Sequence, residues 1–545
     1  MKHSPSRRHF FKNTGAVSAA AVLGSTASLS AWGASSNAAL LSSAKQVNLT
    51  ATQALAAMKA GTLTATAYVT TLIARAKSVS DLNGMIFINE TGALAAAKQV
   101  DADRAAGKKL GALAGLPFVI KDNINTNGMK TTGGTSSLRD FQPTKNAPSV
   151  QKLLDAGAII LGKSNLHEWA FGITSTNFTL GIDPISKAAN RAGKNPYDTS
   201  RIPGGSSGGT AIAVATRFAP VGLGTDTGGS TRVPASFCGI AGFRPSVGDG
   251  AGKGRRYADG VNDALPISTT RDTVGPMGRT VADIALLDAV ITGGAVPTAK
   301  SLKGLRIGIP AAFWSGLDDS VKPVAEAAKK KLADAGVVFV NGDLTGIMEL
   351  NGSMSFPIAL HEPVAAIPAY LSANNAPVKT VAAVIAGLAS PDVQGAFGAI
   401  AGDVFGPAPG GNGAYAAAMV PVTGGRAMLQ KLYKDYFAAQ GVECVLFPTT
   451  LLAAPKIDTA KGSDKLSYTV GGVEQKDKDT FGTCIRNTDP CTNAGIPSLS
   501  IPAGLTAGGL PVGMEIDGPL GSDNNLLAIG MGIEAVWGAL AAPKV

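Results

Sequence analysis

Gly224-Thr-Asp-Thr-Gly-Gly-Ser230 is the stretch on which the fold and the chemistry of this chain can first be argued. A second segment of the same kind, Gly204-Gly-Ser-Ser-Gly-Gly209, precedes it, and a helix is predicted between them over residues 210–217. The two glycines before Ser230 leave backbone N–H groups unshielded, so these groups can converge on a developing oxyanion. One glycine-serine segment alone is typically a flexible linker. Two of them flanking one helix favour a serine nucleophile beside its own oxyanion hole.

The base that such a serine needs is not supplied by histidine. Beyond residue 38 the chain holds only His167 and His361, and neither has a partner arrangement typical of a Ser-His-Asp triad. His167 opens a helix predicted over residues 164–171, where a surface or capping role is expected. A lysine base is the known variant of the triad logic.

Lys121 has the setting that a lysine base requires. The apolar run 116–120 ends in Lys121-Asp-Asn123, which predicts a buried strand with polar residues at its end. A lysine base must be neutral, so its pKa has to fall from about 10.4 by roughly three units, a shift that burial can supply. The alternative is a structural lysine paired with Asp122.

Gly157-Ala-Ile-Ile-Leu-Gly-Lys-Ser164 satisfies the phosphate-loop pattern but favours a different structure. A phosphate loop needs exposed N–H groups between its glycines, whereas Ala-Ile-Ile-Leu is typical of a buried strand whose N–H groups are paired. We therefore interpret Lys163 as a structural residue at a strand end, which leaves nucleotide binding as a weak rival.

The rest of the chain alternates short apolar strands with helices. Short amphipathic helices are predicted over residues 50–107, with Gly61 and Gly107 as helix stops. Further helices and strands follow in alternation. The helices include 150–156, and the strands include 158–161, 305–309, 442–447 and 498–501. This alternation predicts an α/β sheet layered by helices. No linker divides residues 39–545, so we expect one domain.

The first 38 residues have the pattern of an export signal. Ser6-Arg-Arg-His-Phe-Phe-Lys12 is a twin-arginine motif, and the small and apolar run 15–29 and the cleavage-like Ser36-Asn-Ala38 follow it. Residues 1–38 are therefore predicted to be a twin-arginine signal peptide, and the protein to be periplasmic or secreted. No later stretch is long and apolar enough to span a bilayer.

The charge and the cysteine content of the chain bear on which partners, metals and disulfides are expected. Removing residues 1–38 takes away four basic residues and no acid, so the net charge falls from +10 to +6 (44 basic minus 38 acidic residues). The remaining charge is diffuse, which disfavours nucleic-acid binding. The four cysteines form no zinc-site pattern. Cys484 and Cys491 flank a turn-rich segment and could form a disulfide or stay as two thiols; the sequence leaves both open.

Longer segments resemble the amidase-signature family. They are Gly115-Leu-Pro-Phe-Val-Ile-Lys-Asp-Asn123, Gly204-Gly-Ser-Ser-Gly-Gly209, and the run from Gly224 through Ser230-Thr-Arg-Val-Pro to Pro245. Residues 161–168 and 509–513 also resemble its recurrent segments. The resemblance covers roughly residues 50–540. It implies a single catalytic domain with a large central mixed β-sheet layered by α-helices.

The resemblance also implies the chemistry. Ser230 would form the acyl-enzyme, Ser206, after a cis peptide bond, would relay its proton, and Lys121 would be the base. The resemblance assigns the oxyanion hole to the N–H groups of Thr227, Gly228, Gly229 and Ser230, and a supporting role to Asp226 and Arg232. Neither a metal nor an organic cofactor is implied.

Segments at 195–198, 201–205, 270–276 and 485–490 look most similar to the indoleacetamide and mandelamide hydrolase branch, which implies small primary arylacetamide-like substrates. The bulky Trp169, the two cysteines and the loose segment 406–413 depart from that pattern and bear on the acyl pocket. The alternatives are an amidase for aliphatic, peptide or polymer-derived amides, and a catalytically idle binding protein on the same fold.

Overall fold

The computed structural model describes residues 40–179, 192–249, 253–407, 409–458, 460–462 and 465–545. The predicted signal peptide, residues 1–38, lies outside them. Residues 40–545 form one compact unit, in agreement with the single domain expected from the sequence.

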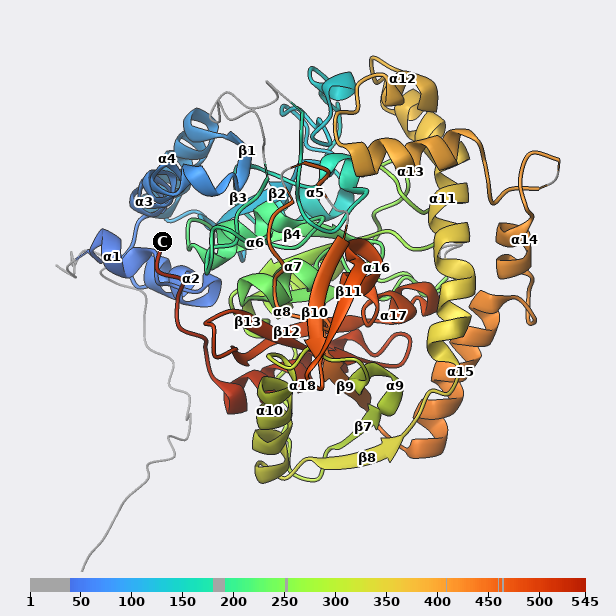
Figure 1. Ribbon diagram of the computed structural model, residues 1–545. Helices are drawn as coiled ribbons and strands as arrows, with labels where there is room; N and C mark the ends of the chain where they lie inside the picture. Colours follow the sequence, from blue (N-terminus) through green and yellow to red (C-terminus); the bar gives the residue numbers. More distant parts are fainter. Residues whose placement is uncertain (1–39, 180–191, 250–252, 408, 459, 463–464) are drawn as a thin grey trace, which may run out of the picture. The chain divides into compact units, whose positions relative to one another are not determined.

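A mixed sheet of eleven strands runs through this unit in the order β1-β3-β2-β4-β6-β5-β12-β13-β9-β7-β8 (Figure 1). β2 lies parallel to β3 and β4, whereas β4, β6, β5, β12 and β13 pair antiparallel in turn. The strands are β1 (Met85–Ile88), β2 (Pro117–Lys121), β3 (Ile159–Ser164), β4 (Val221–Asp226), β5 (Ala241–Arg244), β6 (Thr273–Gly278), β7 (Arg306–Pro310), β8 (Val338–Gly342), β9 (Cys444–Pro448), β12 (Ser498–Leu505) and β13 (Pro511–Asp517); a separate hairpin joins β10 (Lys465–Val470) and β11 (Val473–Asp479).

Helices cover both faces of the sheet. Alternation along β12 shows why: Leu499 and Ile501 pack on α8, α10 and α18, while Ser498 and Ser500 face the other side. The helices are α1 (Ser43–Gln46), α2 (Ala51–Lys59), α3 (Ala65–Ser78), α4 (Glu90–Ala105), α5 (Pro148–Asp155), α6 (Gly208–Ala215), α7 (Arg232–Cys238), α8 (Val281–Thr292), α9 (Ala311–Trp314), α10 (Lys322–Asp334), α11 (Ile347–Ala373), α12 (Val381–Ile385), α13 (Pro391–Ala401), α14 (Ala414–Met419), α15 (Gly425–Gln440), α16 (Thr480–Ile485), α17 (Asp489–Ala494) and α18 (Asp523–Trp537).

Most of the predicted elements are present with shifted ends, but the helix over residues 164–171 is wrong. β3 continues through Ser164, and only a short 3-10 turn, Glu168–Ala170, follows. The backbone amides here bond to distant loops: His167 N–H donates to the Ser206 carbonyl and Trp169 N–H to the Gly133 carbonyl. These tertiary bonds replace the bonds that a helix would make within itself.

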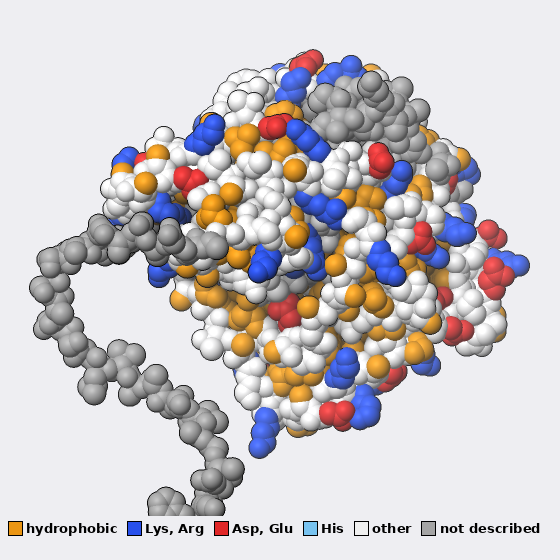
Figure 2. Space-filling view, turned by 90° about the vertical axis from the view of Figure 1, so that its left-hand side faces the viewer, with side chains coloured by type: hydrophobic (Ala, Val, Ile, Leu, Met, Phe, Trp, Pro, Cys, Tyr) orange, Lys and Arg blue, Asp and Glu red, His pale blue; other side chains and the backbone are white. Residues whose placement is uncertain are grey.

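Surface charge is dispersed on the described part of the chain. Figure 2 shows Lys and Arg side chains scattered singly over one face, interspersed with acidic and apolar groups. No helix among the described residues combines the length and the apolarity needed to cross a bilayer.

The disulfide that the sequence left open is not formed in the structure, where Cys484 and Cys491 are buried free thiols. Cys484 lies in α16 within an apolar cluster, and burial raises its pKa to about 12. Cys491 lies in α17, where its thiol donates to the Thr488 carbonyl and receives a hydrogen bond from Arg232. The two sulfurs therefore lie in different surroundings, one apolar and one hydrogen-bonded.

We expect thiol titration of the unfolded, non-reduced protein to find four free thiols per chain, since Cys238 and Cys444 are also free and buried. A count of two would contradict the structure and restore the disulfide.

Candidate active site

Lys121 ends β2 with its side chain fully buried. β2 pairs with β4, so the amine reaches the last residues of that neighbouring strand. Its Nζ lies 2.7 Å from Ser206 Oγ and 2.7 Å from Thr225 Oγ1. Asn123 Nδ2 also donates to Thr225 Oγ1 at 3.0 Å. The Thr225 oxygen has a second lone pair for an amine N–H, which leaves the lone pair of a neutral amine for Ser206.

Burial lowers the pKa of Lys121 from 10.5 to about 7, and the charges of Asp226 and Asp272 oppose part of that shift. Asp122 is not the partner of Lys121, because it forms its ion pair with Lys163 at 3.4 Å. The structural ion pair with Asp122, which was the alternative role for Lys121, is therefore made by Lys163. The Lys163 amine also donates to the Ile124 carbonyl at 2.8 Å. Its place in β3 confirms that the phosphate-loop pattern is a strand.

Ser206 follows a cis peptide bond with Gly205, as the resemblance implied. Its hydroxyl faces Lys121, whereas the hydroxyl of the adjacent Ser207 donates to the Thr225 carbonyl at 3.2 Å. The Ser207 N–H donates to the Ser230 carbonyl at 3.2 Å, so the two glycine-rich segments lie against each other. The geometry therefore separates the roles of the two neighbouring serines.

The backbone carbonyls of residues 226–229, which lead to Ser230, are each held by a donor. The donors are Arg244 Nη1 for Asp226 (2.8 Å), Arg271 Nε for Thr227 (3.0 Å), Thr488 Oγ1 for Gly228 (2.6 Å) and Val233 N for Gly229 (2.8 Å). In a planar trans peptide the next N–H points away from the carbonyl, so holding a carbonyl also aims an N–H.

Three of the four N–H groups expected in the oxyanion hole remain free. Within the described part of the chain, the N–H groups of Thr227, Gly228 and Ser230 have no protein acceptor. The Gly229 N–H differs from the expectation, because it donates to Asp226 Oδ1 at 3.0 Å. Gly229 also has φ 130° and a Cβ there would lie 2.2 Å from Thr488 Oγ1, so only glycine fits.

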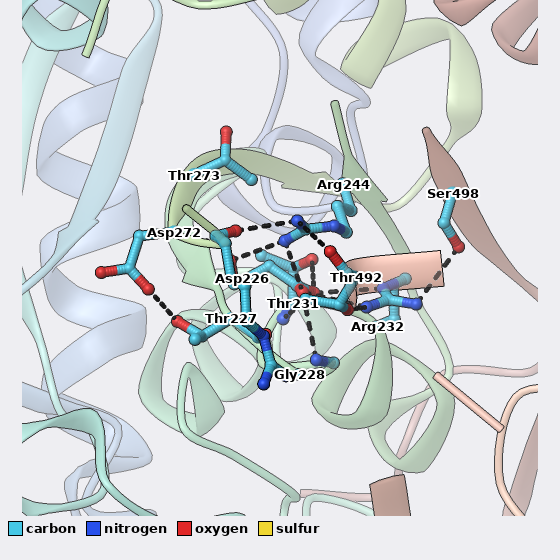
Figure 3. A network of polar contacts seen from close by, with 12 residues as sticks. Asp226, Thr227, Gly228, Thr231, Arg232, Arg244, Asp272, Thr273, Thr492 and Ser498 are labelled. Atoms are coloured by element: carbon cyan, nitrogen blue, oxygen red, sulfur yellow. Dashed lines mark hydrogen bonds and ion pairs between the residues drawn. The ribbon is translucent and has the colours of Figure 1, made fainter. Parts of the chain in front are cut away.

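Asp226 is the centre of the network in Figure 3. Its two oxygens accept from the Gly229 and Thr231 amides and from Arg232 Nε and Nη2 at 3.1 and 2.9 Å. Arg244 adds an ion pair at 3.2 Å. Burial alone would raise the pKa of the Asp226 carboxyl, but the two guanidiniums outweigh it and hold that pKa well below its ordinary value.

Cys491, Glu515 and Asp517 bring three groups with metal-ligating atoms close together. Arg232 Nη1 lies 2.9 Å from Cys491 Sγ and 2.6 Å from Glu515 Oε1. A fixed guanidinium cation thus occupies the position beside these ligands and repels a metal cation. The cluster is part of the support of Arg232.

A cavity of about 310 Å³ opens beside Thr227, Gly228 and Ser230. Aromatic and aliphatic side chains make up most of its remaining wall: Phe171, Ile173, Ile267, Phe356, Leu360, Phe481 and Ile485. Arg271, Asp392 and Asp479 are the charged residues at its border. The site therefore joins a serine hydroxyl, free N–H groups and an apolar cavity, which is an arrangement suited to acyl transfer.

Comparison with known proteins agrees with this geometry. The profile of the family described as Amidase matches residues 67–527. The chain belongs to the amidase family. It is 37% identical to the mandelamide hydrolase of Pseudomonas putida, with 91% of this chain and 92% of the relative covered. It is 39% identical to an indoleacetamide hydrolase of Agrobacterium vitis, with 88% and 94% covered.

A solved structure, the native peptide amidase of Stenotrophomonas maltophilia, matches this amidase with a TM-score of 0.71 and 28% identity, covering 91% of this chain and 98% of that one. The amidase-signature fold and the amide-hydrolase activity expected from the sequence are therefore confirmed. The identity of the amide is a separate question.

Sequence reasoning missed several residues of the amidase site. His167 is fully buried instead of at the surface, and its Nε2 lies 3.1 Å from Asp392 Oδ2. Arg271 belongs to a segment that resembles relatives, but its contact with Thr227 could not be inferred from spacing. Phe356 and Phe481 lie in segments without a motif, so their place in the cavity depends on the fold.

We expect kcat/KM of the amidase to rise with pH and level off above an apparent pKa of about 7, because the base must be deprotonated and Lys121 has that pKa. Lys121→Ala should lose on the order of 10³-fold or more in kcat/KM at neutral pH. Rate measurements across pH 5.5–9 test both. A flat profile, or near-full activity in Lys121→Ala, would show that another group is the base.

Proposed function

We propose that the amidase cleaves its amide through a Ser230 acyl-enzyme with Ser206 as proton relay and neutral Lys121 as base. Ser230 Oγ attacks the carbonyl carbon while its proton passes to Ser206, and the Ser206 proton passes to Lys121. The oxyanion forms opposite the N–H groups of Thr227, Gly228 and Ser230. The proton then returns through Ser206 to the departing nitrogen, and the C–N bond breaks. Water next attacks the acyl-enzyme while its proton passes through Ser206 to Lys121, and that proton returns to Ser230 Oγ as the carboxylic acid leaves.

One observation carries this proposal: the buried Lys121 amine, with a pKa near neutrality, lies 2.7 Å from Ser206 Oγ without a carboxylate partner among the described residues. An amine of that kind can accept a proton at neutral pH, whereas an amine held in an ion pair would stay charged. Asp226 and Arg232 support the reaction by fixing the loop, the role that the family resemblance implied for them.

We propose small primary amides with an aromatic ring near the carboxamide as the substrate class. Mandelamide and indoleacetamide, for which two relatives are named, are amides of this kind. The apolar cavity beside Ser230 supports the proposal, because phenylalanine and isoleucine side chains suit an aryl group. Peptide amides are the competing class, since a similar solved structure is a peptide amidase.

Ammonia release across a matched panel of aryl, alkyl and peptide amides tests the substrate class. We expect kcat/KM for arylacetamides to exceed that for alkyl amides of equal length by at least about tenfold, since burying an aromatic ring contributes on the order of 2 kcal/mol. Faster cleavage of alkyl or peptide amides would assign the other class.

A fluorophosphonate probe tests the nucleophile independently of the amide. The intact amidase should be labelled at Ser230 and Ser230→Ala should not be. Ser207→Ala is the matched control, because it removes a neighbouring hydroxyl that bonds the Thr225 backbone and should retain labelling. Absence of labelling in the intact chain, together with no ammonia from the panel, would favour the idle binding protein.

We also propose export by the twin-arginine route, supported by Arg7-Arg8 and the run that follows them. Cell fractionation should find the wild-type chain in the periplasm or the medium, and the Arg7→Lys/Arg8→Lys variant in the cytoplasm. Lys12→Arg, which keeps the pair, should behave like wild type. Export of the double variant would contradict the proposed route.

A further inference from the structure

Arg271 is a buried arginine whose guanidinium joins three parts of the site. It precedes β6, and its side chain is 2% exposed. Nε donates to the Thr227 carbonyl at 3.0 Å, and Nη1 donates to the Ser355 carbonyl of α11 at 3.0 Å. Nη2 forms an ion pair with Asp489 at the start of α17. Each nitrogen of the guanidinium therefore has a separate anchor.

The next residue holds the same threonine from its side chain. The Thr227 hydroxyl donates to Asp272 Oδ1 at 2.6 Å, a contact drawn in Figure 3. Asp272 Oδ2 in turn accepts from the amides of Ile267 and Ser268 at 2.8 and 2.9 Å. The dipeptide 271–272 thus fixes Thr227 by its carbonyl and by its hydroxyl.

We propose that Arg271 is a positioning residue for the oxyanion hole. The Thr227 carbonyl and the Gly228 N–H belong to one planar peptide and point in opposite directions. By holding the carbonyl on one side, Arg271 aims the Gly228 N–H towards the place where the oxyanion develops. Gly228 has no side chain to fix its peptide plane, so this external anchor sets its orientation.

The Ser355 contact links the aim of this N–H to the acyl pocket. Ser355 and its neighbour Phe356 are both in α11 and both border the cavity, as does Arg271 itself. Arg271 therefore joins the wall of the pocket to the Thr227 carbonyl. The inference depends on serine acyl transfer and is independent of which amide is cleaved.

A lysine could not replace this arginine. The planar guanidinium presents its donors as a rigid fork, and the three anchors lie in different directions around it. A lysine amine is a single point charge, so it could keep the ion pair with Asp489 but has no second nitrogen to donate to the Thr227 carbonyl. Arg271→Lys therefore keeps the positive charge and removes the hydrogen bond to Thr227.

The test compares ligands that use the oxyanion hole with ligands that do not. The substrate is a primary amide that the panel shows to be cleaved. One inhibitor is the aldehyde analogue of this amide, which forms a tetrahedral adduct with Ser230. The other inhibitor is the carboxylic acid product. In Arg271→Lys and Arg271→Met we expect kcat to fall about ten- to hundredfold, less than removal of an oxyanion donor outright. KM should change less than threefold, the aldehyde Ki should rise in parallel with the loss of kcat/KM, and the product Ki should stay within threefold.

Arg256→Met is the matched control. Arg256 is a partly buried arginine that pairs with Asp288 of α8 and contacts neither Thr227 nor Asp272. It should leave the ratio of the two Ki values unchanged. If Arg271→Met does not fold, as judged by circular dichroism, Asp489→Asn keeps the shape of that side chain, loosens Arg271 from its far side and should raise the aldehyde Ki selectively. Equal weakening of both inhibitors, or an unchanged kcat in Arg271→Lys, would overturn the proposal.

Fluorophosphonate labelling of the wild-type chain separates this result from the proposed function. If the wild type is labelled and the Arg271 variants lose aldehyde affinity no more than product affinity, the nucleophile stands and the positioning role is wrong. If the wild type is not labelled, the proposed function itself fails.

Discussion

A carboxylate buried between two guanidiniums fixes the loop that carries Ser230, and the site depends on that loop. Asp226 ends β4, Arg232 begins α7, and Arg244 ends β5, so their ion pairs join three elements at one point. A buried pair is a weak source of stability, but losing one partner leaves an uncompensated charge and costs about 3–5 kcal/mol. The loop from Thr227 to Ser230 therefore cannot relax without breaking the network. Its free N–H groups are oriented before a substrate arrives, which is the condition for strong oxyanion stabilisation.

The same arrangement makes a neutral lysine compatible with a site full of carboxylates. Lys163 neutralises Asp122, two arginines hold Asp226, and Asp272 accepts from a hydroxyl and two amides. None of the three contacts Lys121, so burial acts on the amine with only long-range opposition from Asp226 and Asp272. Direct contact with any of them would raise the pKa of Lys121 towards its ordinary value and keep the base charged.

The sequence was sufficient for the parts of the site that local patterns determine. Apolar runs ending in polar residues located β2 and β3, and the shortage of histidine pointed to Lys121. Prediction failed where contacts that no local pattern marks decide the path of the backbone or the place of a side chain. Residues 164–171 look helical, but Ser206 and Gly133 accept their amides. His167 looks like a surface residue, yet the fold places it against Asp392 of a helix far along the chain. Arg271 belongs to the same group, since nothing local marks its reach to Thr227.

Trp169, one of the departures from the family pattern, does not line the cavity but packs behind its wall. The indole is fully buried and packs edge-on against Phe397 of α13, with ring centroids 5.6 Å apart. Phe171, which does line the cavity, makes a similar contact with Phe397 at 5.2 Å. α13 also gives Ala396 and Ala399 to the cavity wall. A smaller aliphatic side chain at position 169 would leave a void beneath this helix, and interiors close such voids only in part. The bulk of Trp169 therefore supports the helix that forms one wall of the cavity, while the catalytic groups stay on the sheet and on the glycine-rich loops.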